Sequence, residues 1–182
     1  YAHVVLRIEP LQRGSGWVFE NTASTEAIPE RFISAIEQGV RAQMAGGISA
    51  GYPVVDVRVT VTGGSFHPTD SSELAFRMAG ALACRDGCAR AGSMLLEPIM
   101  TVEVNTPDSF VGQIGGDIAR RRGTLIGIDE CANGKLVRAE VPLAEMFGYA
   151  TGLRSMTQGR ATHSMVFTKY IEGPVAVLPV DE

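Results

Sequence analysis

The sequence has few lysines, few cysteines and no long apolar run. Only 2 of its 16 basic residues are lysine, so positive charge is carried almost entirely by guanidinium groups, which suit phosphate and carboxylate. Three cysteines at unremarkable spacing do not indicate a disulfide framework and favour a reducing compartment. No stretch approaches the roughly 18 apolar residues that cross a membrane, and the N-terminal segment lacks the apolar core of a signal peptide. We therefore expect a cytoplasmic protein with no membrane partner.

The motifs of common catalytic and metal sites are also missing. The sequence has no Gly-x-x-x-x-Gly-Lys-Ser/Thr phosphate loop, no His-Glu-x-x-His pair and no Gly-x-Ser-x-Gly elbow. Cys84 and Cys88 lie one helical turn apart, but no second Cys or His pair completes a ligand set, so we interpret both as small buried helix residues. We predict that this chain has no catalytic site, no metal site and no cofactor of its own.

What the sequence does contain is enough apolar residues for a folded interior. Of its 182 residues, 45% are apolar and 20% are charged, which excludes a disordered or fibrous chain. The length allows one large domain or two small ones. A net charge of −4 argues against coating nucleic acid by bulk charge, although a local basic site can still recognise RNA.

Alternation of apolar and polar residues predicts three strands in the first half. Residues 17–21 follow a turn-rich loop after residues 2–9, so we interpret these two segments as a hairpin. The valines of residues 55–61 give the cleanest half-buried strand, and residues 63–69 after it are expected to form a loop.

Two helices are predicted in the same half. One begins after Pro29 and ends at Gly46 and Gly47. The other opens at residues 70–73, which have the spacing of a capping box, and ends near residue 91. Four residues are expected to form the buried stripe of this second helix: Leu74, Met78, Ala81 and Leu82.

The second half has the element order of a split βαβ domain. We place a domain boundary near residue 96, where a short junction follows the second helix. The predicted elements are a strand over 100–104, a helix opened by Thr106 and Pro107, strands over 124–129 and 135–141 joined by an Asn133-Gly134 turn, a helix over 142–155 and a strand over 161–170. This order predicts an α+β protein whose second domain is ferredoxin-like.

Two loops of the first half carry candidate RNA-binding residues. If the hairpin and the valine strand share one sheet, both loops can emerge at the same end. Arg13, Gly14, Ser15 and Gly16 would offer a guanidinium group and open backbone N–H groups to phosphate or ribose. Phe66 and His67 would add a stacking ring and a hydrogen-bonding ring. An ordinary Gly-rich turn and a surface histidine explain the same residues, and the alternatives stay open.

Two further segments have equally ordinary explanations. Arg120, Arg121 and Arg122 end a predicted helix, where cations complement the helix dipole, so their pattern does not separate this role from RNA binding. Gln158 and Arg160 belong to a segment that fits either an RNA contact or a plain loop before an edge strand.

Eight strings follow one another along the chain, at residues 9–11, 13–16, 50–57, 70–73, 95–100, 121–123, 141–151 and 157–160, among them the DSSE and VPLAEMFGYAT sequences. Together and in this order they resemble the C-terminal part of translation elongation factor G, the ribosomal translocase family. The resemblance spans about residues 1–172. Residues 1–96 look like the fourth domain of that family, residues 97–172 look like the fifth, and residues 173–182 form a tail without the family's usual helix.

The resemblance implies a fold and a division of labour. The fourth domain of the family has a ribosomal-protein-like βαβ fold with a left-handed crossover, an exception to the usual right-handed rule. A fragment of this kind lacks the upstream GTP-binding domain, so GTP, Mg²⁺ and GTPase activity would belong to the full-length parent and not to this chain. The parent would act in GTP-dependent translocation of tRNA and mRNA, with the fragment as its ribosome-contacting lever.

The resemblance also implies partners. A monomer would contact the small-subunit decoding region and the tRNA–mRNA duplex through a tip that contains Arg13 to Gly16, Phe66 and His67. The second domain would contact RNA and protein at the stalk base of the large subunit through Arg120, Arg121, Arg122, Gln158 and Arg160. Three alternatives stay open: a paralogue acting in ribosome recycling, a free-standing ribosome- or RNA-binding protein, and a location in the mitochondrial matrix or chloroplast stroma.

Overall fold

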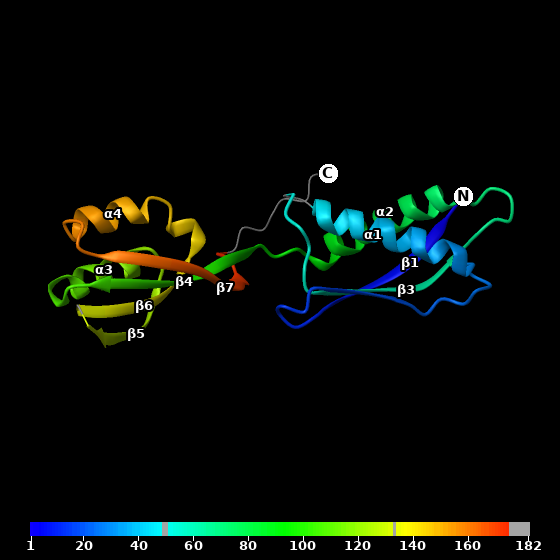
Figure 1. Ribbon diagram of the computed structural model, residues 1–182. Helices are drawn as coiled ribbons and strands as arrows, with labels where there is room; N and C mark the ends of the chain where they lie inside the picture. The colour runs from blue at the N-terminus through cyan, green and yellow to red at the C-terminus, as the bar shows by residue number, and fades with distance from the viewer. Residues whose placement is uncertain (49–50, 133, 175–182) are drawn as a thin grey trace. The chain divides into compact units, whose positions relative to one another are not determined.

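The computed structural model describes residues 1–48, 51–132 and 134–174. Among these residues the chain divides between Met94 and Leu95 into two compact units, each with its own sheet and its own pair of helices (Figure 1). The α+β class predicted from the sequence is confirmed. Within the described residues, no helix has the length and apolar content needed to span a membrane.

The first unit contains a three-stranded sheet in the order β1-β3-β2. β1 (His3–Pro10) pairs antiparallel with β3 (Val57–Ser65), and β2 (Trp17–Asn21) pairs parallel with β3. The predicted hairpin is therefore wrong, because β3 lies between the two strands that we expected to pair. Val59 and Val61 on β3 are fully buried, which explains why this strand occupies the centre. The hand of the β2–α1–β3 crossover stays a prediction.

β3 is shifted toward the C-terminus relative to the predicted strand. It begins at Val57 rather than residue 55 and continues through Gly63, Gly64 and Ser65, which we expected to form a loop. A Cβ atom at Gly64 would lie 2.2 Å from the His3 carbonyl oxygen, so glycine allows the strands to approach where a side chain would prevent it.

The two helices of this unit cover one face of its sheet (Figure 1). α1 (Ile33–Gly46) follows a 3₁₀ turn, Glu30–Phe32, as the Pro29 and Gly46 signals predicted. α2 (Glu73–Ala91) begins where expected, but its N-cap is Ser72, whose Oγ accepts from the Ala75 N–H at 3.2 Å. The predicted capping box is wrong by this shift, because Glu73 becomes the first helical residue.

The predicted buried stripe of α2 is also wrong. Leu74, Met78 and Leu82 are 61%, 58% and 49% exposed, while the buried residues are Phe76, Gly80, Cys84 and Cys88. The reason is the close packing of α2 on α1, where a Cβ at Gly80 would lie 2.9 Å from the Ile36 carbonyl oxygen. Small residues therefore face α1, and the burial of both cysteines confirms their interpretation as core residues.

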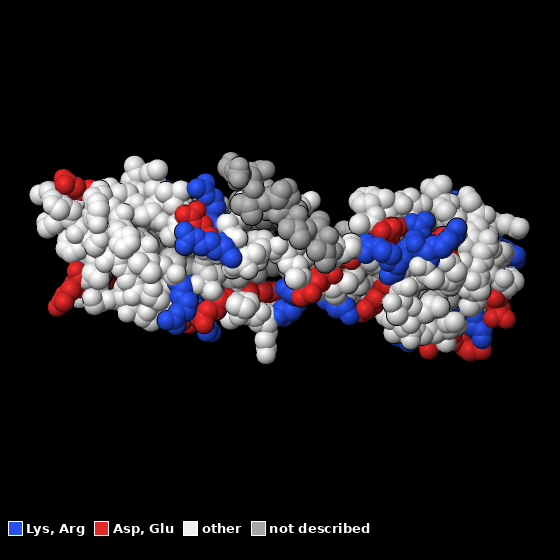
Figure 2. Space-filling model, turned by 180° about the vertical axis from the view of Figure 1, so that it is seen from behind, with Lys and Arg blue, Asp and Glu red and all other residues white. Residues whose placement is uncertain are grey.

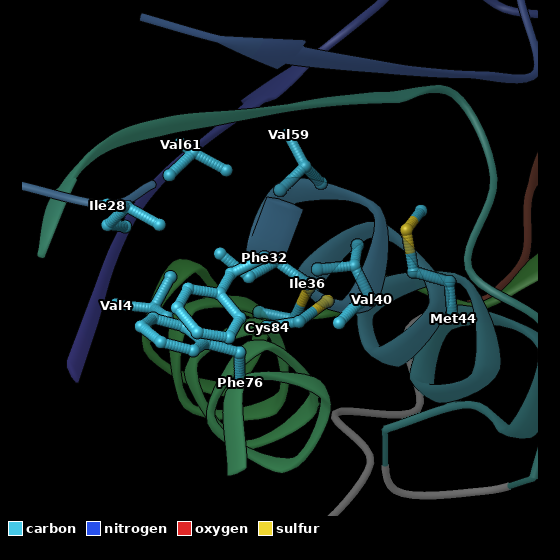
Figure 3. Packing of buried hydrophobic residues seen from close by; sticks show 12 residues of the cluster. Val4, Ile28, Phe32, Ile36, Val40, Met44, Val59, Val61, Phe76 and Cys84 are labelled. Carbon is cyan, nitrogen blue, oxygen red and sulfur yellow. The ribbon is translucent and has the colours of Figure 1, made fainter. Parts of the chain in front are cut away.

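The core of the first unit joins both helices to the sheet (Figure 3). Phe32 and Phe76 stack with ring centroids 4.5 Å apart, and Ile36, Val40 and Met44 extend the contact along α1 toward Val59 and Val61 of β3.

The second unit is ferredoxin-like, as predicted. Its sheet has the order β5-β6-β4-β7 with every neighbouring pair antiparallel. The side chains of α3 and α4 pack on one face against β4 and β6. The elements are β4 (Leu96–Thr106), α3 (Val111–Arg120), β5 (Thr124–Cys131), β6 (Gly134–Pro142), α4 (Tyr149–Met156) and β7 (Thr162–Glu172).

Two details of the second unit differ from the prediction. Pro107, and not Thr106, caps a 3₁₀ turn (Asp108–Phe110) that leads into α3. The single helix predicted over 142–155 is a 3₁₀ turn (Leu143–Glu145) followed by α4, because Gly148 adopts a left-handed φ of 73° at the α4 N-cap. The Asn133 turn signal lies outside the described residues.

Candidate nucleic-acid interface

The two candidate loops of the first unit lie at opposite ends of its sheet. The β1–β3 register pairs His3 with Ser65 at one end and Pro10 with Val57 at the other. The Arg13–Gly16 loop follows Pro10, whereas Phe66 and His67 follow Ser65. Eight strand residues separate the ends by about 25 Å. The expectation of one shared tip is wrong, because it depended on a β1–β2 hairpin that does not form.

The Arg13–Gly16 loop is organised by a buried carboxylate that the sequence analysis missed. Asp56 is 6% exposed, and its Oδ1 accepts from the Gly16 N–H at 3.0 Å while Oδ2 lies 3.5 Å from Arg13 Nη1. Its backbone is also tied in, because the Leu11 N–H donates to the Asp56 carbonyl at 2.7 Å. Asp56 itself has a left-handed φ of 60°. The only sequence signal was an acidic residue opening a valine-rich strand.

The electrostatics of this loop follow from those contacts. Burial raises the pKa of the Asp56 carboxyl, but hydrogen bonds from the Gly14 and Gly16 N–H groups and from Arg13 outweigh burial, so the pKa lies below its usual value. The ionised carboxylate therefore occupies the place that a phosphate would take in a Gly-rich anion loop. The predicted role of these N–H groups as open phosphate donors is wrong.

The His67 loop is exposed and tightly hydrogen-bonded. The His67 N–H donates to Ser71 Oγ at 2.8 Å, and Ser71 Oγ donates to the Tyr1 carbonyl at 2.6 Å. The ring nitrogen Nδ1 lies 3.1 Å from Asp70 Oδ2 and 3.1 Å from Thr69 Oγ1. The loop thus presents an imidazole ring on a fixed backbone, a group that can hydrogen-bond to RNA phosphate or ribose.

Phe66 behaves differently from its neighbour. Its ring is half-buried and packs against the core of the first unit. The face that packs on the core is not open to an RNA base, so the structure supports an anchoring role for Phe66 in the loop. The predicted stacking role of Phe66 is not tested.

Three consecutive arginines at the end of α3 have three different environments. Arg121 is 21% exposed: Nε donates to Asp117 Oδ2 at 2.9 Å, Nη1 donates to the Glu145 carbonyl, and the guanidinium lies 5.1 Å from the Tyr149 ring centroid. Arg122 donates from both Nη atoms to the Glu97 carboxylate, at 3.0 and 2.9 Å, and from Nε to the Glu145 carboxylate at 3.0 Å. Arg120 is 78% exposed, and its Nη2 donates to Asp117 Oδ1 at 2.8 Å.

These contacts shift nearby pKa values. The hydrogen bonds that Arg122 donates to the carboxylates of Glu97 and Glu145 raise the pKa of Arg122. Burial raises the pKa of Tyr149 to about 12. Arg121 and Arg122 therefore mainly stabilise the second unit through contacts within it. Arg120 is the most exposed of the three and the most accessible to a partner.

Gln158 and Arg160 lie in a tight turn at the end of α4. Gln158 has a left-handed φ of 54°, and the Gly159 N–H donates to the Arg154 carbonyl at 2.8 Å. The Arg160 guanidinium stacks 5.1 Å from the ring centroid of Phe110, at the start of α3. Arg121 lies over Tyr149 at the opposite end of α3 from Phe110. The arginines that end α3 and the Gln158–Arg160 turn are therefore separated by about 15 Å, the length of α3.

The surface charge is mixed. On the face drawn in Figure 2, basic and acidic side chains lie next to one another on each unit, and most of the surface is neither. The described residues include no group of three or more His, Cys, Asp or Glu side chains that could hold a metal ion. Phe147, in the turn before α4, is 80% exposed.

Comparisons with known proteins agree with the two-unit architecture. Residues 1–92 match the family model described as elongation factor G, domain IV, and residues 94–178 match the model of the elongation factor G C-terminus. A crystal structure of a protein from Thermus thermophilus is 37% identical and has a TM-score of 0.85. The match covers 94% of this chain and 26% of that one, so the chain spans about a quarter of its length.

Proposed function

The chain belongs to the elongation factor G family, and we propose that it is the ribosome-contacting part of a factor that drives GTP-dependent translocation of tRNA and mRNA. The observation that carries the proposal is the order of the two matched domains, domain IV followed by the C-terminal domain, each folded around its own core. GTP, Mg²⁺ and GTP hydrolysis are assigned to parts of the parent outside this chain, because the chain has no phosphate loop.

The mechanism we propose is mechanical. The first unit supplies a stiff sheet whose central strand β3 leads directly into the His67 loop. Hydrolysis elsewhere in the parent reorients the factor, and the loop then holds the advanced tRNA–mRNA duplex at the small-subunit decoding region. Packing that resists bending is part of this function, since a soft sheet would not transmit displacement.

The candidate contacts divide between the units. His67 is assigned to the codon–anticodon backbone, and the Arg13–Gly16 loop, at the other end of the sheet, is not part of that contact. In the second unit, Arg120, Gln158 and Arg160 are exposed and are assigned to the large-subunit stalk base. Arg121 and Arg122 support this surface through Glu145, Asp117 and Glu97.

The test uses the full-length parent. His67→Ala is expected to slow single-round translocation while GTP turnover on ribosomes is unchanged. Arg13→Ala is the matched control, since it removes a cation from the opposite end of the same sheet, and translocation should keep its rate. Unchanged translocation in His67→Ala would sink the proposal. A parent that separates ribosomal subunits but leaves tRNA in place would instead indicate a recycling paralogue.

A further inference from the structure

His67 is held by its own loop through a single ring nitrogen. Nδ1 lies 3.1 Å from Asp70 Oδ2, 3.1 Å from Thr69 Oγ1 and 3.3 Å from the Asp70 backbone nitrogen. The backbone is fixed as well, because the His67 N–H donates to Ser71 Oγ and the Ser71 N–H donates back to the His67 carbonyl at 3.2 Å. The ring therefore has a defined orientation, although it lies at the surface.

The other ring nitrogen has no such contact. Within the part of the chain that the structure describes, Nε2 of His67 makes no hydrogen bond, and the side chain is 52% exposed. An imidazole with one engaged and one open nitrogen presents a single edge to a ligand.

We propose that Asp70 is a positioning residue for His67, engaging Nδ1 so that Nε2 is the edge that meets a phosphate or ribose oxygen of RNA. The proposal rests on the proposed function, which supplies the RNA, and adds the residue that selects the ring edge. The Asp70 carboxylate oxygen Oδ2 lies 3.1 Å from Nδ1 and the Asp70 N–H donates to the same nitrogen at 3.3 Å, so Asp70 engages Nδ1 and leaves Nε2 open to a ligand.

Asp70 carries this role more than its neighbour. It approaches Nδ1 with both its carboxylate and its backbone nitrogen, whereas Thr69 contributes one hydroxyl that also donates to Asp70 Oδ1 at 3.4 Å. A purely structural role is the alternative, because an acidic residue just before α2 also complements the helix dipole. That role would change stability but not the ring nitrogen shifts of His67.

The first measurement is therefore spectroscopic. The chain labelled with ¹⁵N-histidine gives ring nitrogen shifts for three histidines, and His67→Gln identifies those of His67. Asp70→Ala is expected to change the Nδ1 and Nε2 shifts of His67, and Asp70→Glu, which keeps a carboxylate, is expected to restore them in part. Unchanged His67 shifts in Asp70→Ala would overturn the positioning role, whatever happens to stability.

The second measurement tests the consequence in the full-length parent. Asp70→Ala is expected to slow translocation about two- to fivefold, the range of an exposed ion pair, with GTP turnover and the thermal unfolding midpoint retained. His67→Gln should slow it at least as much. If the His67 shifts change but neither variant slows translocation, the positioning of the ring stands, and the contact with RNA, and the proposed function with it, is what fails.

Discussion

Asp56 Oδ1 accepts a hydrogen bond from the Gly16 N–H at 3.0 Å, across 40 residues of sequence. The bond joins the start of β3 to the end of the loop between β1 and β2. The Val57 N–H donates back to the Gly16 carbonyl at 3.2 Å, so the loop and the strand are tied in both directions. This pair decides the conformation of a loop whose composition had indicated phosphate binding.

Asp56→Asn is the first prediction. We expect it to lower the free energy of unfolding by about 1–3 kcal/mol at pH 7, because an amide cannot replace a carboxylate that accepts several bonds. Asparagine tolerates the left-handed φ of 60°, so the change isolates the charge from backbone strain. Urea unfolding followed by the fluorescence of Trp17, the single tryptophan, measures the effect in the first unit.

The same variant has a pH signature. The pKa of Asp56 is lower in the folded chain than in the unfolded chain. The carboxylate therefore contributes its full stabilisation above the unfolded-state pKa of about 3.9, and this stabilisation is lost as the pH falls through the folded-state pKa. The difference in the free energy of unfolding between Asp56→Asn and the unsubstituted chain should therefore shrink below about pH 4. Glu37→Gln, in an exposed pair with Arg41, is the control. A difference that is the same at pH 3 and pH 7 would contradict the assignment.

Gly39→Ala is the second prediction. A Cβ at Gly39 would lie 2.0 Å from the Arg77 carbonyl oxygen and 3.2 Å from the Ala81 nitrogen, so α1 and α2 must move apart. We expect a loss of about 1–3 kcal/mol in the free energy of unfolding. Gly46→Ala, in the same helix with open space around its Cβ, should change it by less than about 1 kcal/mol. Equal effects of the two substitutions would refute the close contact.

The third prediction compares two neighbours on α2. Phe76→Ala should cost about 3–5 kcal/mol, because Phe76 is fully buried against Phe32. Met78→Ala should change the stability of the chain by less than about 0.5 kcal/mol, because its side chain faces solvent. Thermal unfolding of both variants checks the order. A large loss of stability in Met78→Ala would contradict the exposed position of Met78 and support the buried stripe predicted from the sequence.

The sequence predicted elements better than their partners. Alternating valines and the Pro29 and Gly46 signals gave a strand and a helix that the structure confirms with small shifts. The order of strands was not visible, because a parallel β2–β3 pair places β3 between two segments that look like a hairpin. The error moved one candidate loop to the wrong end of the sheet.

Burial was hardest to predict on α2, where a glycine and not a large apolar side chain lies on the face that packs against α1. The α2 pattern offered two helical faces, and the more apolar one, with Leu74 and Met78, is exposed, because the close approach to α1 needs Gly80 on the inner face. Ion-pair partners were equally hidden. Nothing in the local sequence links Arg122 to Glu97 or Arg121 to the Glu145 carbonyl, since these contacts depend on how the second unit folds.

The last prediction compares Arg120, which we assign to binding, with Arg121, which we assign to stabilising the second unit. Arg121→Ala removes the Asp117 ion pair, the bond to the Glu145 carbonyl and the contact with Tyr149, so we expect a loss of about 1–3 kcal/mol in the free energy of unfolding. Arg120→Ala leaves Arg121 on the same Asp117 carboxylate and should change stability by less than about 0.5 kcal/mol.

Affinity for ribosomes should show the opposite order once stability is accounted for. If Arg120 contacts RNA phosphate, Arg120→Ala in the full-length parent weakens binding and lowers the salt dependence of binding by about one phosphate contact. Arg120→Lys, which keeps the charge, should retain most of the affinity, so charge rather than shape is tested. Binding that is unchanged in Arg120→Ala but weakened in a folded Arg121→Ala would mean that the second unit meets its partner through the α4 side of this surface instead.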